Sequence, residues 1–301
     1  MAVSRDILKG FVDMHVHAGP SIAVRKVDAA EMLEKAEAAG YRAFLVKDHY
    51  FPTMMGTKMV MEHMAKEGCL VFGGIALNQS VGLFNLHALD AAYQLGAKTV
   101  YFPTVSAKNH IVGHSGGHFV GSGNMTVVDE GIVYIDENGE LVDEAVKVLE
   151  YLVQKPDLIL CTGHGSAAEV DALVRKAVEL GVKKIVVNHP HFLVNATYEQ
   201  MAKWAELGAY IELNAAVFSS IAVSGKCSDD VIGEILKVVP KDKIVLDSDL
   251  GQKVNVDPVE GMYQFICKLV EEFGVTEEEI NLMGKETPAK LLGLDQIPVQ
   301  A

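Results

Sequence analysis

Residues 157–190 read DLILCTGHGSAAEVDALVRKAVELGVKKIVVNHP. Two near-continuous apolar runs, typical of strands covered on both faces, flank a stretch whose apolar positions recur at helical spacing. Ser166 and Glu169 fit a capping box at the start of that stretch, and Gly181 provides a left-handed stop at its end. The segment therefore predicts a strand–helix–strand unit.

The same unit recurs along almost the whole chain. Capping boxes beginning at Asp28, Thr197 and Thr276 mark further helix starts. Eight strands, each followed by a helix, predict an α/β fold, a closed (β/α)8 TIM barrel forming a single domain over residues 1–301. A doubly wound open sheet is the competing architecture. The expected strands are 11–17, 42–49, 70–78, 97–104, 157–164, 183–190, 208–215 and 243–249.

One segment interrupts the rhythm. Residues 105–142 contain a glycine- and histidine-rich stretch followed by GIVYIDENGELV. The latter predicts a β-hairpin that turns at Glu137-Asn138-Gly139. We expect an insertion after the fourth strand that lies over the barrel mouth, and a helical C-terminal stretch, 258–294, that closes the barrel.

The composition excludes several classes of function. The formal net charge of −14 argues against nucleic acid or an anionic membrane as a partner. The four cysteines lie far apart, which suits reduced thiols. The sequence has no apolar run of signal-peptide or membrane-spanning length, so we expect a cytoplasmic protein that acts on a small molecule, with a homo-oligomer as a further expectation.

Histidines and carboxylates gather at the ends of the expected strands, where barrel enzymes keep their chemistry. Because residues i and i+2 of a strand point to the same face, His15 and His17 should project together into the barrel mouth. Imidazoles from different strands, with a carboxylate, suit a divalent cation such as Zn²⁺, with Mn²⁺ or Fe²⁺ as alternatives. The strand-end residues are His15, His17, Lys47, Asp48, His49, Asn78, His164, His189, Asp247 and Asp249.

Several of these residues admit more than one interpretation. His15 and His17 taken alone would also fit a buried histidine pair. His49 is a metal ligand, a substrate contact or a histidine bonded to a backbone carbonyl, and Lys47 is either a functional amine or the partner of Asp48. Asn78 is a candidate substrate-binding residue.

The insertion carries three histidines at four-residue intervals, His110, His114 and His118. Helical spacing would align their imidazoles, but Gly113, Gly116 and Gly117 disfavour a regular helix. A glycine-hinged lid that brings these histidines to the substrate is one interpretation, and a solvated loop without a catalytic role is the other.

This pattern resembles the amidohydrolase superfamily of metal-dependent hydrolases. The resemblance rests on the His-x-His of the first strand, the histidines ending strands five and six, the aspartate ending strand eight, and a C-terminal TPAKLLGL. It implies metal ligation by His15, His17, His164, His189 and Asp249, with Asp247 in reserve for the last. It also implies that Asp249 moves a proton in catalysis.

The chain departs from the binuclear members of that superfamily at the fourth strand. Their bridging lysine or glutamate would stand there, but this strand ends in Phe102-Pro103-Thr104, and Lys98 comes too early. Lys47 and His49 on the second strand are possible substitutes, with catalytic roles. We therefore expect one or two metal ions.

The leading hypothesis is a metal-dependent hydrolase in which metal-activated water attacks a C–N bond, a lactone C–O bond or a phosphoester of a small molecule. The same site could instead serve a decarboxylase or an isomerase, since the superfamily includes both. A third hypothesis, from another class, is a metal-stabilised binding protein without turnover.

Overall fold

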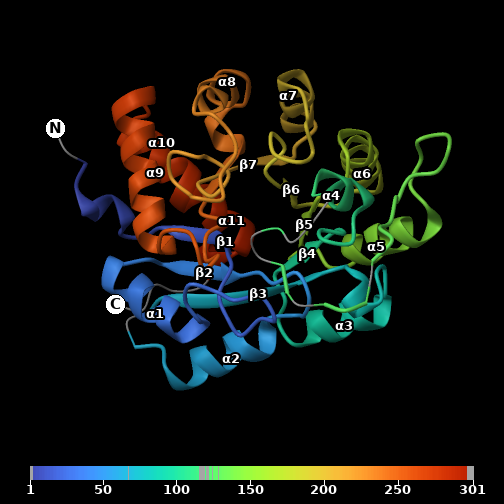
Figure 1. The fold of residues 1–301 in the computed structure, drawn as a ribbon, viewed down its shortest axis with the longest axis horizontal. Helices are drawn as coiled ribbons and strands as arrows, with labels where there is room; N and C mark the ends of the chain where they lie inside the picture. The colour runs from blue at the N-terminus through green and yellow to red at the C-terminus, as the bar shows by residue number, and fades with distance from the viewer. Residues whose placement is uncertain are drawn as a thin grey trace.

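The computed structural model describes residues 3–66, 68–114, 119, 122–123, 125–127 and 129–296. Its centre is a sheet of eight parallel strands hydrogen-bonded in the order β1 to β8 (Figure 1). The predicted (β/α)8 barrel is thus confirmed, and the open doubly wound sheet is not the architecture. The strands are β1 Val12–Val16, β2 Ala43–Val46, β3 Leu70–Ala76, β4 Thr99–Tyr101, β5 Ile159–Cys161, β6 Ile185–Val187, β7 Tyr210–Asn214 and β8 Ile244–Asp247.

Residues just beyond β8 join the last strand to the first. The backbone N–H of Asp249 donates to the carbonyl of His15 over 2.7 Å, and the N–H of His17 donates to the carbonyl of Leu250 over 2.8 Å. The Ser248 hydroxyl also bonds the His15 carbonyl at 3.2 Å. The two edges of the sheet therefore meet at His15 in β1 and at His17 just after it.

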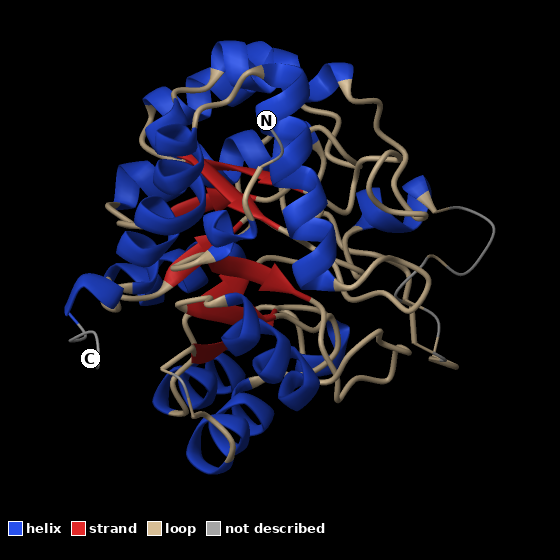
Figure 2. Cartoon of the chain, turned by 90° about the vertical axis from the view of Figure 1, so that its left-hand side faces the viewer, coloured by secondary structure: helices blue, strands red, loops and turns tan. Residues whose placement is uncertain are grey.

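Helices surround the strands, and the strand arrows all point toward the side where the long loops gather (Figure 2). Among the described helices, none is both long and apolar enough to cross a membrane. The helices are α1 Ala29–Ala39, α2 Met54–His63, α3 Leu86–Gln94, α4 Lys108–Gly113, α5 Asp143–Val153, α6 Ala167–Leu180, α7 Tyr198–Glu206, α8 Asp230–Val238, α9 Pro258–Phe273, α10 Glu277–Asn281 and α11 Thr287–Leu292.

The capping boxes predicted from the sequence form as written. At each of the four, the side chain of the N-cap residue accepts from the N3 backbone and the N3 side chain accepts from the N-cap backbone. This satisfies two of the N–H groups that a helix leaves unpaired at its start. The helices therefore begin at fixed residues.

The C-terminal helix α11 covers the barrel interior at the end opposite the long loops. Leu291 and Leu292 pack in one apolar cluster with Val12, Leu45 and Val245, which belong to three different strands. The predicted helical C-terminal stretch is present, and its leucines fill the closed end of the barrel. Apolar packing therefore occupies one end and leaves the other for polar side chains.

The segment after β4 departs from the repeating unit. It contains the short helix α4 and then reverses direction around Asp136, whose carboxylate accepts from the N–H groups of Asn138 and Glu140. Within the described residues the expected hairpin amounts to one antiparallel bridge, between Ile135 and Leu141, without a two-stranded ladder. Backbone bonds from the Asp136 N–H to the Glu140 carbonyl at 2.8 Å and from the Val142 N–H to the Tyr134 carbonyl at 3.1 Å join the two arms, and the side-chain bonds of Asp136 reinforce the turn.

Glu169, the N3 residue of α6, also ties this segment to the barrel. Its side chain is 2% exposed. One carboxylate oxygen accepts from the Tyr134 N–H at 3.0 Å, and the other accepts from the Ser166 N–H at 2.9 Å and from the Ser166 hydroxyl at 2.8 Å. One buried carboxylate thus serves both the helix cap and the connection that follows β4.

We expect Glu169→Ala to lower the free energy of unfolding by about 2 to 3 kcal/mol, because it leaves buried donors without an acceptor. Glu169→Gln, which retains one carbonyl oxygen, should cost less. Urea unfolding followed by circular dichroism measures both. Glu150→Ala, at an exposed position of α5, is the control and should stay within about 0.5 kcal/mol of the parent. A Glu169→Ala protein as stable as this control would contradict the assignment.

Candidate active site

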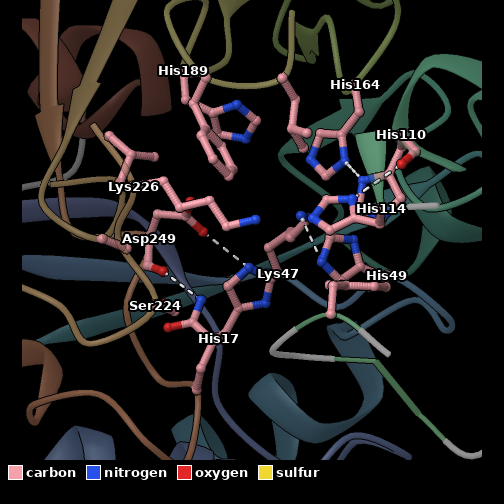
Figure 3. Close-up of a pocket in the computed structure, with 16 residues that line it drawn as sticks. His17, Lys47, His49, His110, His114, His164, His189, Ser224, Lys226 and Asp249 are labelled. Carbon is pink, nitrogen blue, oxygen red and sulfur yellow. Dashed lines mark hydrogen bonds and ion pairs between the residues drawn. The ribbon is translucent and has the colours of Figure 1, made fainter. Parts of the chain in front are cut away.

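A cavity of about 230 Å³ opens among the loops that follow the strands (Figure 3). It is small beside the cavities that hold drug-sized ligands, which are about 300 to 1,000 Å³. The cavity lies at the end of the barrel where the catalytic and metal-binding residues were predicted from the sequence. Its polar and charged lining residues are His17, Lys47, His49, His110, His114, His164, His189, Ser224, Lys226, Asp249 and Gln252.

Five imidazoles from four strand ends form a closed circuit around the inner part of the site. The ring centroids of His15 and His17 are 5.3 Å apart, and those of His17 and His49 are 5.0 Å apart. From His49 the distance to His164 is 5.6 Å, from His164 to His189 it is 5.0 Å, and from His189 to His15 it is 6.2 Å. The structure therefore brings together all four histidines that the sequence nominated as metal ligands, with His49 beside them.

His15, His17 and Asp249 supply three donor atoms that converge. Oδ1 of Asp249 lies 3.2 Å from Nε2 of His15 and 3.0 Å from Nε2 of His17. Nε2 of His15 is buried and has no hydrogen-bond partner among the described residues, although Asp249 is close. An orphaned imidazole nitrogen, a second imidazole and a carboxylate together offer donors that can hold a divalent transition metal. The residues thus fit the predicted metal site.

Burial keeps most of these imidazoles neutral, as ligands must be. It lowers the pKa of His17, His49 and His164 well below the usual range, and Lys47 and neighbouring imidazoles act in the same direction. Burial also lowers the pKa of His189. At His15 burial opposes the charge, but Asp249 and Glu212 outweigh it and raise the pKa.

Glu212, on β7, is a functional residue that the sequence reasoning missed. Its carboxylate is 1% exposed and lies 2.9 Å from Nδ1 of His15, which leaves Nε2 of His15 facing Asp249. It also accepts from the backbone N–H of His189 at 2.8 Å, and from the side-chain amides of Asn188 and Asn214 at 2.9 and 3.1 Å. One carboxylate therefore orients two of the proposed ligands. The available signal was a lone acidic residue inside the apolar strand GAYIELNA.

The two candidate aspartates of β8 occupy different places. Asp249 lines the cavity, and its side chain is 14% exposed. Asp247 is 1% exposed and groups with His15 and Glu212 below the cavity. Burial, with the charges of Glu212, Asp13 and Asp249, raises the pKa of Asp247 well above its usual range. Asp249 faces the cavity together with His17 and Asp247 does not, so the geometry favours Asp249 as the ligand.

The insertion contributes His110, which contacts a proposed ligand directly. Nδ1 of His110 lies 2.8 Å from Nδ1 of His164, and the two rings are stacked with centroids 4.8 Å apart. Asn109, its neighbour on α4, donates to the carbonyl oxygens of His164 and Leu193, both at 3.1 Å. His110 and Asn109 therefore fix the ring and the backbone of His164 from above.

The other histidines of the insertion are placed differently. His114 lines the cavity, with its ring centroid 4.3 Å from that of His110, and its Nδ1 lies 3.0 Å from the His110 carbonyl oxygen. His118 lies outside the described residues. Substrate binding by these histidines stays a prediction.

Lys47 and His49 follow β2 into the cavity. Nζ of Lys47 lies 3.5 Å from Nε2 of His49 and 5.3 Å from the centre of the Tyr101 ring. Burial lowers the pKa of this amine to about 8. The carboxylate of Asp48 pairs with Arg25 at 3.2 Å, so the ion pair considered between Asp48 and Lys47 is not the one that forms.

Asn78 lies behind His49, and its side-chain amide is fully engaged. Its nitrogen donates to the His49 carbonyl and to the Thr104 hydroxyl, both at 2.7 Å, while its oxygen accepts from the backbone N–H groups of Thr104 and Ser106. Thr104 in turn lies 2.9 Å from Nδ1 of His49. The contacts of Asn78 make it a positioning residue for His49, and the substrate contact predicted for it stays untested.

Unusual backbone conformations accompany the ligands. Asp249 has a φ of 50°, in the left-handed region that non-glycine residues rarely adopt. At Gly163, before His164, a Cβ would lie 2.3 Å from the Phe102 carbonyl oxygen, and at Gly251 it would lie 1.9 Å from that of His17. Glycine at these two positions lets the chain pass close enough to place both ligands.

Comparison with known structures defines the class of fold. An amidohydrolase from Pseudomonas aeruginosa has a TM-score of 0.62 at 12% identity, covering 96% of this chain and 97% of that one. The organophosphorus hydrolase from Deinococcus radiodurans has a TM-score of 0.57 at 14% identity, covering 97% of this chain and 94% of that one. A Xaa-Pro dipeptidase has a TM-score of 0.54 at 15% identity, covering 95% of this chain and 76% of that one. The chain has the barrel fold of these amidohydrolase-type proteins, as the sequence predicted.

The sequence assigns the chain to a narrower group, a single protein family. Residues 10–212 match the model of a family of unknown function, DUF6282, and the chain belongs to that family. No curated protein matches the sequence. The matched segment contains His15, His17, His164, His189 and Glu212, whereas Asp249 lies beyond it.

We expect Glu212→Gln to weaken binding of Zn²⁺ by about 10- to 100-fold, because an amide accepts more weakly from His15 and carries no charge. Calorimetric titration of the metal-stripped protein gives the affinity, and circular dichroism confirms the fold. Glu206→Gln, at an exposed position of α7, is the matched control and should bind as the parent does. Equal affinities for the two variants would contradict the role given to Glu212.

Proposed function

We propose that the protein is a metal-dependent hydrolase acting on a small molecule. The observation that carries the proposal is the convergence of His15, His17 and Asp249 at the mouth of the barrel, with His164 and His189 in the same circuit of imidazoles. These five residues would hold the metal, for which we propose Zn²⁺, with Mn²⁺ or Fe²⁺ as alternatives and room for one or two ions. A bound divalent cation would supply an activated water and polarise the bond to be broken.

The side chains around that position have distinct tasks. Asp249 is the only acidic residue among the described lining residues, so its carboxylate is the group that can accept a proton from the attacking water and deliver it to the leaving group. Lys47, an amine held in a water-poor environment, can stabilise negative charge that develops on the substrate. His49 reaches the cavity between Lys47 and Thr104 and can donate to or accept from the substrate.

We also propose which types of bond the protein hydrolyses. One structural neighbour is named as a dipeptidase and another as an organophosphorus hydrolase, so barrels of this shape serve more than one bond type. A C–N bond, a lactone or a phosphoester each presents an electrophilic centre to water. The small cavity favours a compact substrate in every case.

We expect Asp249→Asn to lower kcat by a factor of about 10² to 10⁴, because the amide cannot accept a proton. The assay is a panel of amides, lactones and phosphoesters, with metal content measured on the same samples. Asp242→Asn, in the exposed turn before β8, is the control and should retain full activity. An Asp249→Asn protein with parental kcat would rule out the proton transfer proposed here.

Removal of the metal should abolish turnover, and addition of Zn²⁺ should restore it. Dialysis against a chelator followed by elemental analysis and activity assays tests this. Product analysis by mass spectrometry belongs to the same experiment. Addition of one water to the substrate supports hydrolysis, release of carbon dioxide or an unchanged mass would point to a decarboxylase or an isomerase, and metal binding without turnover would point to a binding protein.

A further inference from the structure

The outer part of the cavity contains a second kind of chemistry, which the histidine circuit does not use. Lys226 and Ser224, on the loop after β7, line the cavity beyond the buried imidazoles. Figure 3 shows the side chain of Lys226 extending into the cavity toward Asp249 and Lys47. Among the described residues, no acidic side chain forms an ion pair with Lys226.

The loop that carries Lys226 is held firmly. The backbone N–H groups of Lys226 and Cys227 both donate to the Val217 carbonyl, at 2.9 and 2.8 Å. Between Ser224 and Lys226 the chain passes so close to Phe218 that a Cβ at Gly225 would lie 2.4 Å from the Phe218 carbonyl oxygen. The amine is therefore exposed at its tip but anchored at its base.

Ser224 is connected to Asp249 by side-chain bonds. Asn255, which is 1% exposed, accepts from the Ser224 N–H at 3.0 Å and donates to the Ser224 hydroxyl oxygen at 2.8 Å. Asn255 also donates to Gln252 at 2.8 Å, and Gln252 donates to the Asp249 carbonyl at 2.7 Å. This network fixes the position of the Lys226 loop relative to the residue proposed to move the proton.

The same network determines what Ser224 can offer a ligand. Because the hydroxyl oxygen already accepts from Asn255, its hydrogen remains available for another acceptor. No acceptor for it is found among the described residues. Within the described part of the chain, the ammonium of Lys226 thus has no acidic partner and the hydroxyl hydrogen of Ser224 has no acceptor, and both groups belong to one anchored loop.

The charge balance of the cavity is opposite to that of the whole chain. The protein carries a formal net charge of −14, whereas the described lining includes two lysines, Lys47 and Lys226, and one carboxylate, Asp249. An acidic surface repels anions in general, so an anion would bind only where cations are gathered. The cavity is such a place.

We propose that the substrate carries an anionic oxygen-acid group, a carboxylate or a phosphate, and that Lys226 and Ser224 bind it at the outer end of the cavity. The bond to be hydrolysed then lies at the inner end, beside Asp249. This deepens the function proposed above and rests on it for the reacting end of the substrate. The anion-binding end is a property of the loop and can be measured without turnover.

The test measures binding of inorganic phosphate and of acetate to the zinc-loaded protein and to the metal-stripped protein, at low ionic strength, by calorimetry or ligand-observed NMR. Lys226→Met should weaken binding by about tenfold in both forms, since it removes one charge-assisted hydrogen bond. Lys226→Arg, which keeps the charge, should restore most of the affinity. The anion that is bound more tightly identifies the substrate group as a phosphate or a carboxylate.

Lys253→Met is the matched control, because Lys253 is exposed on the neighbouring loop and does not line the cavity. It should change the affinity by less than about twofold, the screened effect of one distant surface charge. Equal weakening by Lys226→Met and Lys253→Met, unchanged binding in Lys226→Met, or no binding of either anion by the parent would each overturn the proposal. The metal content and turnover assays described above report separately on the hydrolase function.

Discussion

The candidate active site depends on the hydrogen bonds that surround one buried, ionised carboxylate, that of Glu212. Burying a charge in a barrel interior is costly unless donors surround it. Burial alone would raise the pKa of Glu212, yet His15 and His189 outweigh it and lower the pKa. Its donors are His15, the backbone of His189, Asn188 and Asn214. Because these groups belong to β1, the end of β6 and β7, satisfying one charge fixes parts of three strand ends at once.

The two ends of the barrel differ, because apolar packing stabilises one end and the candidate active site lies at the other. At the closed end, Leu291 and Leu292 of α11 pack with strand residues in an apolar cluster that needs no polar partner. At the open end, polar side chains replace apolar ones, and the rings of two proposed ligands have supporting groups, Glu212 for His15 and His110 for His164. Such supporting contacts set the orientation of ligands and tune their affinity for a metal. The mouth is therefore an ordered polar network.

The parts of this arrangement that follow from local pattern were predictable from the sequence. The strand–helix–strand unit around Ser166, with its capping box and terminal Gly181, predicted both its own structure and the repeat that builds the barrel. His15, His17, His164 and His189 could be nominated because the strand ends of a closed barrel must meet at one mouth. The hairpin expected near Asp136 is a tight reversal with one antiparallel bridge, held by backbone bonds and by the side chain of Asp136.

The roles of residues that depend on contacts between separate strands and loops could not be predicted in the same way. Glu212 is a single acidic residue in an otherwise apolar strand. Only its contact with the end of a neighbouring strand shows that it binds His15. Asn78 stands at a strand end, and the sequence did not show that its amide makes four hydrogen bonds, to His49, Thr104 and Ser106. Lys226 lies on a loop without any motif, and its direction depends on the anchoring of its neighbour Ser224 by Asn255.

Asp249 shows how such contacts can also hold a residue in a conformation that its sequence disfavours. Its φ of 50° lies where a non-glycine residue pays a conformational cost of about 1 to 3 kcal/mol. The backbone N–H of Asp249 is bound to the His15 carbonyl, and its own carbonyl is bound by Gln252. Both partners are themselves fixed, His15 by Glu212 and Gln252 by Asn255. The strained backbone of Asp249 is thus supported from the His15 side and from the side of the Lys226 loop, so a change at either end of the cavity acts on the position of Asp249.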